Sequence, residues 1–245
     1  MYRKPYFVYR FRFLYNRKMS GLETSVGGGL LVGTKIELCH AYEDIISIEN
    51  LLAAWKEFVC EKQKKRDIQE FASQLMSNVL ALHEDLKRGR YRHGGYHAFK
   101  INDPKPRDIH KASVRDRLVH HALYRILYPF FDRTFVADSY SCRIDKGTHR
   151  AMNRFRACAY TVSRNHTRTA WVLKGDIRKF FASIDHEVLL VILHEYIPDM
   201  RIIALLRNIV SSFSHEILPP TQGRGQNDGR GRKKGLPLGN LTSQL

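Results

Sequence analysis

A short apolar run that leads into an aspartate constrains this chain most, because it predicts a strand and a reactive group together. The segment VLKGDIRKFFASID covers residues 172–185, and the run Trp171-Val172-Leu173 at its start is typical of a buried β-strand. Asp176 would stand at the end of that strand, where a poorly hydrated carboxylate is costly unless a cation or a donor compensates it. Magnesium prefers oxygen ligands, and phosphoryl transfer commonly uses two such ions. Asp176 is therefore a candidate metal ligand, and a helix N-cap is the main alternative.

Other polar residues in the chain have simpler interpretations. Asp185 directly precedes the apolar run HEVLLVIL, so we expect it to cap a helix. His186 and His194 lie about two helical turns apart, which is not the spacing of a zinc-binding helix. We expect His120 and His121 to be structural or solvent-facing and not to bind a metal.

The chain is strongly basic. Lys plus Arg number 41 and Asp plus Glu number 24, which gives a net charge of +17 among 245 residues. Such an excess favours a polyanionic partner, with nucleic acid as the first candidate and a merely solvated basic surface as the alternative. The four cysteines lack the close spacing of a zinc or redox pair, and no apolar stretch is long enough to span a membrane. We expect a soluble cytoplasmic protein with reduced thiols.

Hydrophobic periodicity predicts a mainly helical chain with one hairpin. Residues 1–40 have no steady period and are expected to form a poorly ordered basic extension. Helical patterns are expected over these ranges: 42–90, from 114 onwards, 149–160, 186–196 and 199–213.

Two local signals refine this prediction. The turn signal Asn102-Asp103-Pro104 predicts a β-hairpin with Lys105 and Arg107 on its return strand. In the helix that follows, Ser113 and Asp116 resemble a capping box, and Pro129 is expected to end or kink the helix.

The segment GDIRKFFASID resembles the first palm motif of reverse transcriptases. In that family the first aspartate binds catalytic magnesium, and an aromatic residue after it rejects a ribose 2′-hydroxyl. The resemblance therefore implies that Asp176 is the catalytic metal ligand and Phe181 the steric gate. The resemblance also implies that Ile177, next to Asp176, contacts the incoming nucleotide.

Two segments are similar to other regions of bacterial reverse transcriptases. DPKPRDIHKASVRDRLVHHAL resembles the fingers, where basic residues meet the triphosphate of the incoming nucleotide. Arg107 is the main candidate for this contact, because its planar fork donates two bonds at once. Lys105 is the second candidate, with a solvated hairpin charge as the alternative. SYSCRIDKGTHRAM resembles the next block and implies that Arg143 lies near template or nucleotide.

The last segment, GLPLGNLTSQ, resembles the palm motif that packs against the nascent base pair. Gly239 would approach the nucleotide closely because it has no Cβ, and Pro237 and Asn240 would lie near the nucleic acid. Leu238 and Gln244 depart from the commonest form of the motif. That variant is similar to the reverse transcriptases of diversity-generating retroelements, which work with a small accessory protein. Group II intron-like enzymes remain an alternative.

Taken together, the resemblance implies an α+β fold: the fingers and incomplete palm of a right-hand polymerase over residues 41–245, with the thumb absent. It implies an RNA-directed DNA polymerase with an RNA template, a DNA primer or cDNA, dNTPs and two Mg²⁺ ions. The Tyr-x-Asp-Asp hairpin of the family does not occur in the sequence. We therefore expect an N-terminal portion that does not polymerise DNA alone, and a non-catalytic RNA-binding module is the rival interpretation.

Overall fold

The computed structural model describes residues 36–102, 106–213 and 234–237. Contacts divide the chain into two units, Met1–Ile36 and Glu37–Leu245, and the fold described below is that of the second unit. The predicted extension over residues 1–40 lies mostly outside the described residues. Leu38, near its end, is buried and donates its backbone N–H to the carbonyl of Tyr196 at 2.8 Å, so it belongs to the packed unit.

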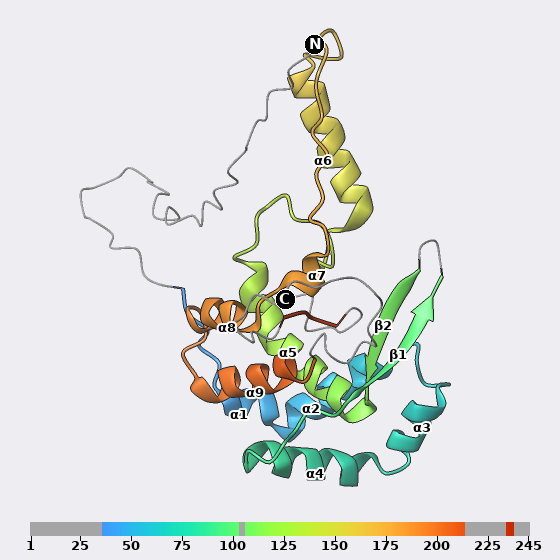
Figure 1. The fold of residues 1–245 in the computed structure, drawn as a ribbon, viewed down its shortest axis with the longest axis vertical. Coiled ribbons are helices and arrows are strands. Elements are labelled where there is room, and N and C mark those ends of the chain that lie inside the picture. Colours follow the sequence, from blue (N-terminus) through green and yellow to red (C-terminus); the bar gives the residue numbers. More distant parts are fainter. Residues whose placement is uncertain (1–35, 103–105, 214–233, 238–245) are drawn as a thin grey trace, which may run out of the picture. The chain divides into compact units, whose positions relative to one another are not determined.

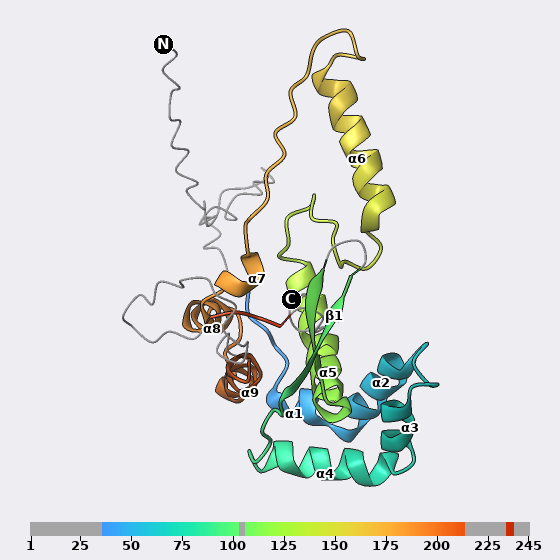
Figure 2. The same cartoon turned by 45° about the vertical axis from the view of Figure 1, so that its right-hand side comes forward.

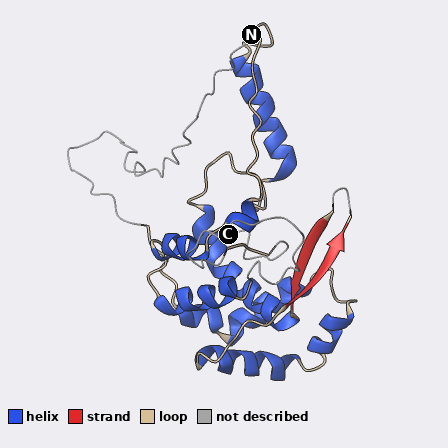
Figure 3. Ribbon diagram, in the orientation of Figure 1, coloured by secondary structure: helices blue, strands red, loops and turns tan. Residues whose placement is uncertain are grey.

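Helices dominate the described residues, as Figures 1 and 3 show. Four helices cover the range predicted as helical near the N-terminus: α1 (Tyr42–Ile46), α2 (Ile48–Val59), α3 (Arg66–Ala72) and α4 (Leu75–Lys87). The remaining helices are α5 (Val114–Asp132), α6 (Gly147–Val162), α7 (Phe180–Ser183), α8 (His186–His194) and α9 (Met200–Ser211). Each helical range predicted from periodicity is therefore confirmed.

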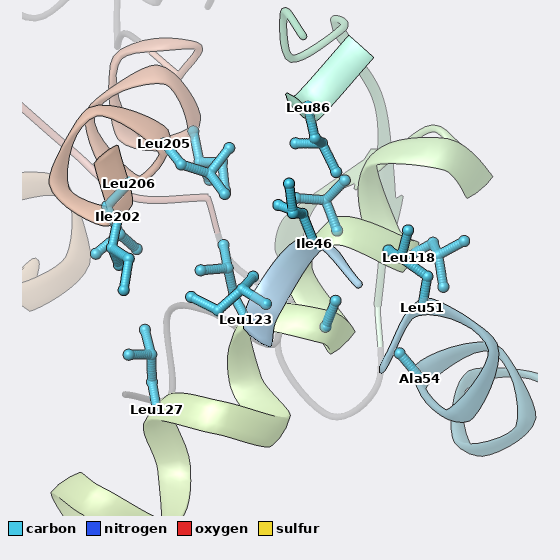
Figure 4. Packing of buried hydrophobic residues seen from close by; sticks show 14 of the residues in the cluster. Ile46, Leu51, Ala54, Leu86, Leu118, Leu123, Leu127, Ile202, Leu205 and Leu206 are labelled. Atoms are coloured by element: carbon cyan, nitrogen blue, oxygen red, sulfur yellow. The ribbon is translucent and has the colours of Figure 1, made fainter. Parts of the chain in front are cut away.

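The hydrophobic core is arranged around α5. Leu118 and Leu123 of this helix are fully buried, and Leu127 is nearly so. Figure 4 shows Leu123 between Leu51 of α2 and Leu206 of α9, with Leu118 beside Leu51. Burying one such side chain contributes roughly 1.5–3 kcal/mol, so contacts of α5 with its neighbours stabilise the unit.

The start of α5 is fixed by a buried carboxylate. Ser113 caps the helix by accepting the backbone N–H of Asp116 at 3.1 Å. The Asp116 carboxylate, which is 2% exposed, accepts bonds from the Tyr91 hydroxyl at 2.8 Å, the Ser113 hydroxyl at 2.6 Å and the Gly94 N–H at 3.2 Å. The predicted cap is confirmed, and the carboxylate additionally ties the helix to the chain before the hairpin.

Pro129 was predicted to end or kink α5, and the structure excludes the first of these outcomes. The helix continues through Pro129 to Asp132, so the proline does not end it. A proline removes one backbone donor and crowds the preceding turn. At Pro129 the missing donor is the N–H that would bond the Arg125 carbonyl, and α5 continues for three more residues before it ends at Asp132.

The predicted hairpin is confirmed. Strand β1 (Tyr96–Ile101) pairs antiparallel with β2 (Arg107–Ala112), and the register places Tyr96 opposite Ala112 and Ile101 opposite Arg107. Residues 103–105 of the turn, including Lys105, lie outside the described residues. The hairpin forms a two-stranded sheet, and the described residues contain no further strand in it.

The prediction of a buried strand over Trp171-Val172-Leu173 is wrong. Residues 171–177 form neither helix nor strand, and Trp171 and Leu173 are each 93% exposed. A strand needs a neighbour for its backbone N–H and C=O groups and a surface for its side chains. Within the described part of the chain no segment pairs with residues 171–177. The local apolar pattern was therefore insufficient to define the strand.

Two further observations concern the chain as a whole. The four cysteines are free and exposed. A search of the described helices finds none that is both long enough and apolar enough to cross a membrane.

Candidate functional site

The structure brings together two of the segments that the sequence singled out. Residues 234–237 run beside the segment that contains α7 and the start of α8. The Leu236 N–H donates to the Phe181 carbonyl at 2.9 Å, and the Gly235 N–H donates to the Ile184 carbonyl at 2.8 Å. These backbone bonds place Pro237 beside Phe181, although more than 50 residues separate them in the sequence.

A glycine and a histidine strengthen this junction. Gly235 has a φ of +104°, a conformation that L side chains rarely adopt, and a Cβ added there would lie 3.6 Å from the Phe213 ring. Its carbonyl lies 2.6 Å from Nε2 of His186, which is buried at the start of α8. Asp185 accepts the N–H groups of Glu187 and Val188 at 3.0 and 3.2 Å, so its predicted cap is confirmed.

Phe181 and Pro237 line an apolar cavity of about 500 Å³. Its other walls come from the end of α5, from α7, α8 and α9, and from the loop after α5. Pro237 is buried and Phe181 is half-buried. The sequence did not predict that Phe180 and Leu236 would also line the cavity, although each is next to a predicted site residue.

Asp176 lies in a different setting from the one expected. Its residue is exposed within the irregular segment 171–177, and Ile177 beside it is 59% exposed. No cluster of three or more metal-ligating side chains occurs among the residues that the structure describes. One exposed carboxylate does not fix two divalent ions, so these residues by themselves do not fit the implied magnesium site.

Arg143 is held by the protein itself. Its guanidinium donates to Asp132 Oδ1 at 2.7 Å, to the Asp132 carbonyl at 2.9 Å and to the Val136 carbonyl at 3.1 Å. The bond from Arg143 holds the pKa of the Asp132 carboxyl below its ordinary value. Here the arginine organises the loop after α5, and its expected contact with template or nucleotide stays a prediction.

The remaining predicted site residues lie on the hairpin or near the end of the chain. Arg107 is the first residue of β2, as the hairpin prediction required, but its side chain is not described. Lys105, Gly239 and Asn240 lie outside the described residues.

The histidines of α5 are structural, as expected. His120 is 1% exposed, and its Nε2 lies 3.0 Å from Nε2 of His93. Burial lowers the pKa of His120 to about 3, and burial followed by repulsion from Lys62 lowers that of His121 to about 4. Both imidazoles are therefore neutral near pH 7, because burial disfavours the charged form.

Comparison with solved structures defines the class of fold. The structure matches the "Partial Cas6-RT-Cas1--Cas2 complex" with a TM-score of 0.50 and 18% sequence identity, over 83% of this chain and 32% of that one. A second match, the "Cas6-RT-Cas1--Cas2 complex", has the same TM-score and covers 20% of the matched chain. The mixed helix and strand architecture is thus that of a reverse transcriptase-like fold.

The sequence relatives lead to the same class. The chain is 23% identical to Protein YkfC of Escherichia coli over 177 residues, 71% of this chain and 43% of that protein. It is 25% identical to the mitochondrial Nuclear intron maturase 1 of Arabidopsis thaliana over 121 residues, and 27% identical to the Group II intron-encoded protein LtrA of Lactococcus lactis over 107 residues. These matches cover 49% and 44% of this chain. No protein-family model matches.

These relatives support the resemblance that the motifs indicated. In sequence the chain is similar to group II intron proteins, and in fold it is similar to the reverse transcriptase-containing complexes. It spans 16%, 43% and 17% of the length of the maturase, YkfC and LtrA, respectively. The resemblance to the enzymes of diversity-generating retroelements stays a prediction.

Proposed function

We propose that this chain is part of an RNA-directed DNA polymerase, which adds dNTPs to a primer 3′-hydroxyl opposite an RNA template. The observation that carries the proposal is the pairing of residues 234–237 with the segment around Phe181. In the resembled family these two motifs flank the nascent base pair. Their contact supports a common site, because the sequence alone separates them widely.

The roles of the residues follow from this proposal. Phe181, which lines the cavity beside Pro237, would stand under the sugar of the incoming nucleotide. Arg107 and Lys105 would meet its phosphates, since cationic side chains on a hairpin reach phosphate oxygens. Gly239 and Asn240 would contact the base pair. Mg²⁺ is the implied cofactor and Asp176 its candidate ligand, with the exposed position of Asp176 as the main argument against this assignment.

The test is primer extension on an RNA template, with the 245-residue chain and with the reading frame extended downstream. We expect no incorporation by the 245-residue chain. In an active extended protein, Asp176→Ala should lower incorporation by at least about 10³-fold if the carboxylate holds the metal. The matched control is Asp185→Ala, because Asp185 caps α8 and has no proposed part in the reaction. Full activity of the Asp176→Ala protein contradicts the metal assignment.

The proposed role of Phe181 as the steric gate is tested in the same assay by comparing the incorporation of ribonucleotides and deoxyribonucleotides. Phe181→Ala should relax discrimination against ribonucleotides, because a smaller side chain leaves room for the 2′-hydroxyl. Phe180→Ala is the neighbouring control, since both phenylalanines line the cavity. Unchanged sugar selectivity in the Phe181→Ala protein would remove the gate role without affecting the assignment of Asp176.

A non-catalytic RNA-binding module is the second candidate. It is favoured by the net charge of +17 and by the absence of a metal-binding cluster among the described residues. The two functions differ in the extended protein: a module would bind RNA in a salt-dependent way and incorporate no nucleotide.

A further inference from the structure

One buried aromatic side chain lies between two regions of the proposed site. Phe213 follows the end of α9 and is 7% exposed. On one side its ring contacts both strands of the β1–β2 hairpin, which extends away from α4 (Figure 2). On its other side lies Gly235, in the segment that pairs with the backbone around Phe181. Phe213 therefore joins the hairpin to the segment that lines the cavity.

The contacts of Phe213 with the hairpin involve one face of the two strands. The Tyr96 ring of β1 meets the Phe213 ring edge to face, with centroids 5.6 Å apart and planes at 90°. The His110 ring of β2 meets it at 4.9 Å and 75°. His110 pairs with Ala98, two residues after Tyr96, so the two rings lie on the same face of the hairpin. Because aromatic pairs prefer edge-to-face contact over a direct face-to-face stack, these contacts favour one orientation of the hairpin.

A polar contact beside Phe213 supports the same orientation. The Tyr96 hydroxyl lies 3.2 Å from the hydroxyl of Ser212, the residue directly before Phe213. Tyr96 also lines the apolar cavity of about 500 Å³, together with Phe181 and Pro237. The first residue of β1 thus belongs both to the hairpin and to the wall of the cavity.

The other side of Phe213 is limited by the backbone at Gly235. A Cβ added to Gly235 would lie 3.6 Å from the ring of Phe213. The Gly235 N–H donates to the Ile184 carbonyl at 2.8 Å, and the Gly235 carbonyl lies 2.6 Å from Nε2 of His186. These bonds fix the backbone against which the ring lies. Since packed interiors transmit displacements, the position of this backbone is passed through the ring to the hairpin.

We propose that Phe213 is a positioning residue, which fixes the orientation of the hairpin relative to the cavity lined by Phe181. This inference rests on the proposed function, in which Arg107 and Lys105 of the hairpin meet the phosphates of the nucleotide whose sugar lies against Phe181. One nucleotide can make both contacts only if the hairpin and the cavity keep a fixed separation, because a misplaced group loses its interaction. Phe213 touches neither the nucleotide nor a metal ion in this role and acts through the hairpin.

The first measurement uses the whole 245-residue chain and requires no activity. The four cysteines, which are all exposed, are replaced by serine. Spin labels are attached to Lys100→Cys on β1 and to His194→Cys at the end of α8, both at exposed positions. Electron paramagnetic resonance then gives the distribution of distances between the two labels, and a fixed hairpin gives a narrow distribution.

Three variants test the role of the ring. Phe213→Leu should make the distribution at least about twice as broad, because both strands lose an edge-to-face contact and an apolar side chain remains. Tyr96→Leu removes the partner ring on β1 and should broaden it in the same direction with Phe213 intact. The matched control is Phe58→Leu, the same change at a buried position of α2, which should leave the distribution unchanged.

Kinetics of an active extended protein separate positioning from stability. Phe213→Leu should raise KM for dNTPs by about fivefold or more and change kcat by less than about twofold, because it weakens binding of the phosphates. A purely structural loss would instead lower the fraction of active enzyme, and with it the apparent kcat, and leave KM unchanged. Phe58→Leu should leave KM for dNTPs unchanged.

Equal widths of the distance distributions in the unchanged, Phe213→Leu and Tyr96→Leu chains would overturn the proposal. An unchanged KM in an active Phe213→Leu protein would overturn it as well. Failure of the proposed function has a different signature, because an extended protein that incorporates no nucleotide contradicts the polymerase assignment. In that case the distance distributions still decide whether Phe213 fixes the hairpin.

Discussion

Helix α5 and residues 147–175, which we call the arm, contain similar apolar residues and bury them very differently. Leu123 of α5 is fully buried, whereas Leu173 of the arm is 93% exposed, although both side chains are leucines. The helices around α5 find their packing partners within the same unit. The run at 171–173 has no partner strand in the part of the chain that is described. Whether an apolar side chain is buried therefore depends on a neighbouring segment that packs against it as well as on the side chain itself.

The largest expected effect tests this contrast directly. Leu123→Ala should lower the free energy of unfolding by about 2–5 kcal/mol, because it leaves a cavity in the core. Leu173→Ala, the matched substitution in the arm, should change it by less than about 0.5 kcal/mol. Urea unfolding followed by circular dichroism measures both. A cost for Leu173→Ala close to that for Leu123→Ala would show that the arm is packed in solution.

A second comparison concerns two carboxylates. Asp116→Asn should destabilise the unit by about 1–3 kcal/mol, because its buried oxygens accept from Tyr91, Ser113 and Gly94. Asp176→Asn, at an exposed position, should leave the free energy of unfolding nearly unchanged. The same urea titration separates them, and a large loss for Asp176→Asn would place that carboxylate in an interior contact.

The pH dependence of stability should come from the core. The folded pKa of His120 is about 3, below the unfolded value near 6.5, so the folded state disfavours the charged ring. The stabilisation is complete above pH 6.5 and is lost as the pH falls toward 3. Linkage gives a loss of about 2 kcal/mol from His120 between pH 7 and pH 5.

A variant isolates that contribution. His120→Gln should remove roughly half of the fall in stability between pH 7 and pH 5, because burial also lowers the pKa of His121, which keeps its own contribution. Thermal unfolding at several pH values provides the measurement. An unaltered slope in the His120→Gln protein would assign the dependence to other groups.

Local patterns predicted most of the fold and less of the candidate site. The periodicity of α5, the turn signal of the hairpin and the position of Asp185 before an apolar run each depend on neighbours in sequence, and each is confirmed. The strand at 171–173 depends on a distant partner, and its prediction is wrong. The contact between Phe181 and Leu236 was not predicted, since it is set by backbone bonds between remote segments.

The Asp116 carboxylate has a mechanical consequence for the hairpin. It bonds Tyr91 and Gly94, which come before β1, and Ser113, which follows β2, so both legs of the hairpin are fastened at a single point. A Cβ at Gly94 would lie 3.0 Å from that carboxylate, so the close approach of this backbone to Asp116 depends on glycine. Each strand has six residues, a length of roughly 20 Å. Because the hairpin is held at its base, a small change of angle there displaces its far end, where β2 begins at Arg107, by a larger distance.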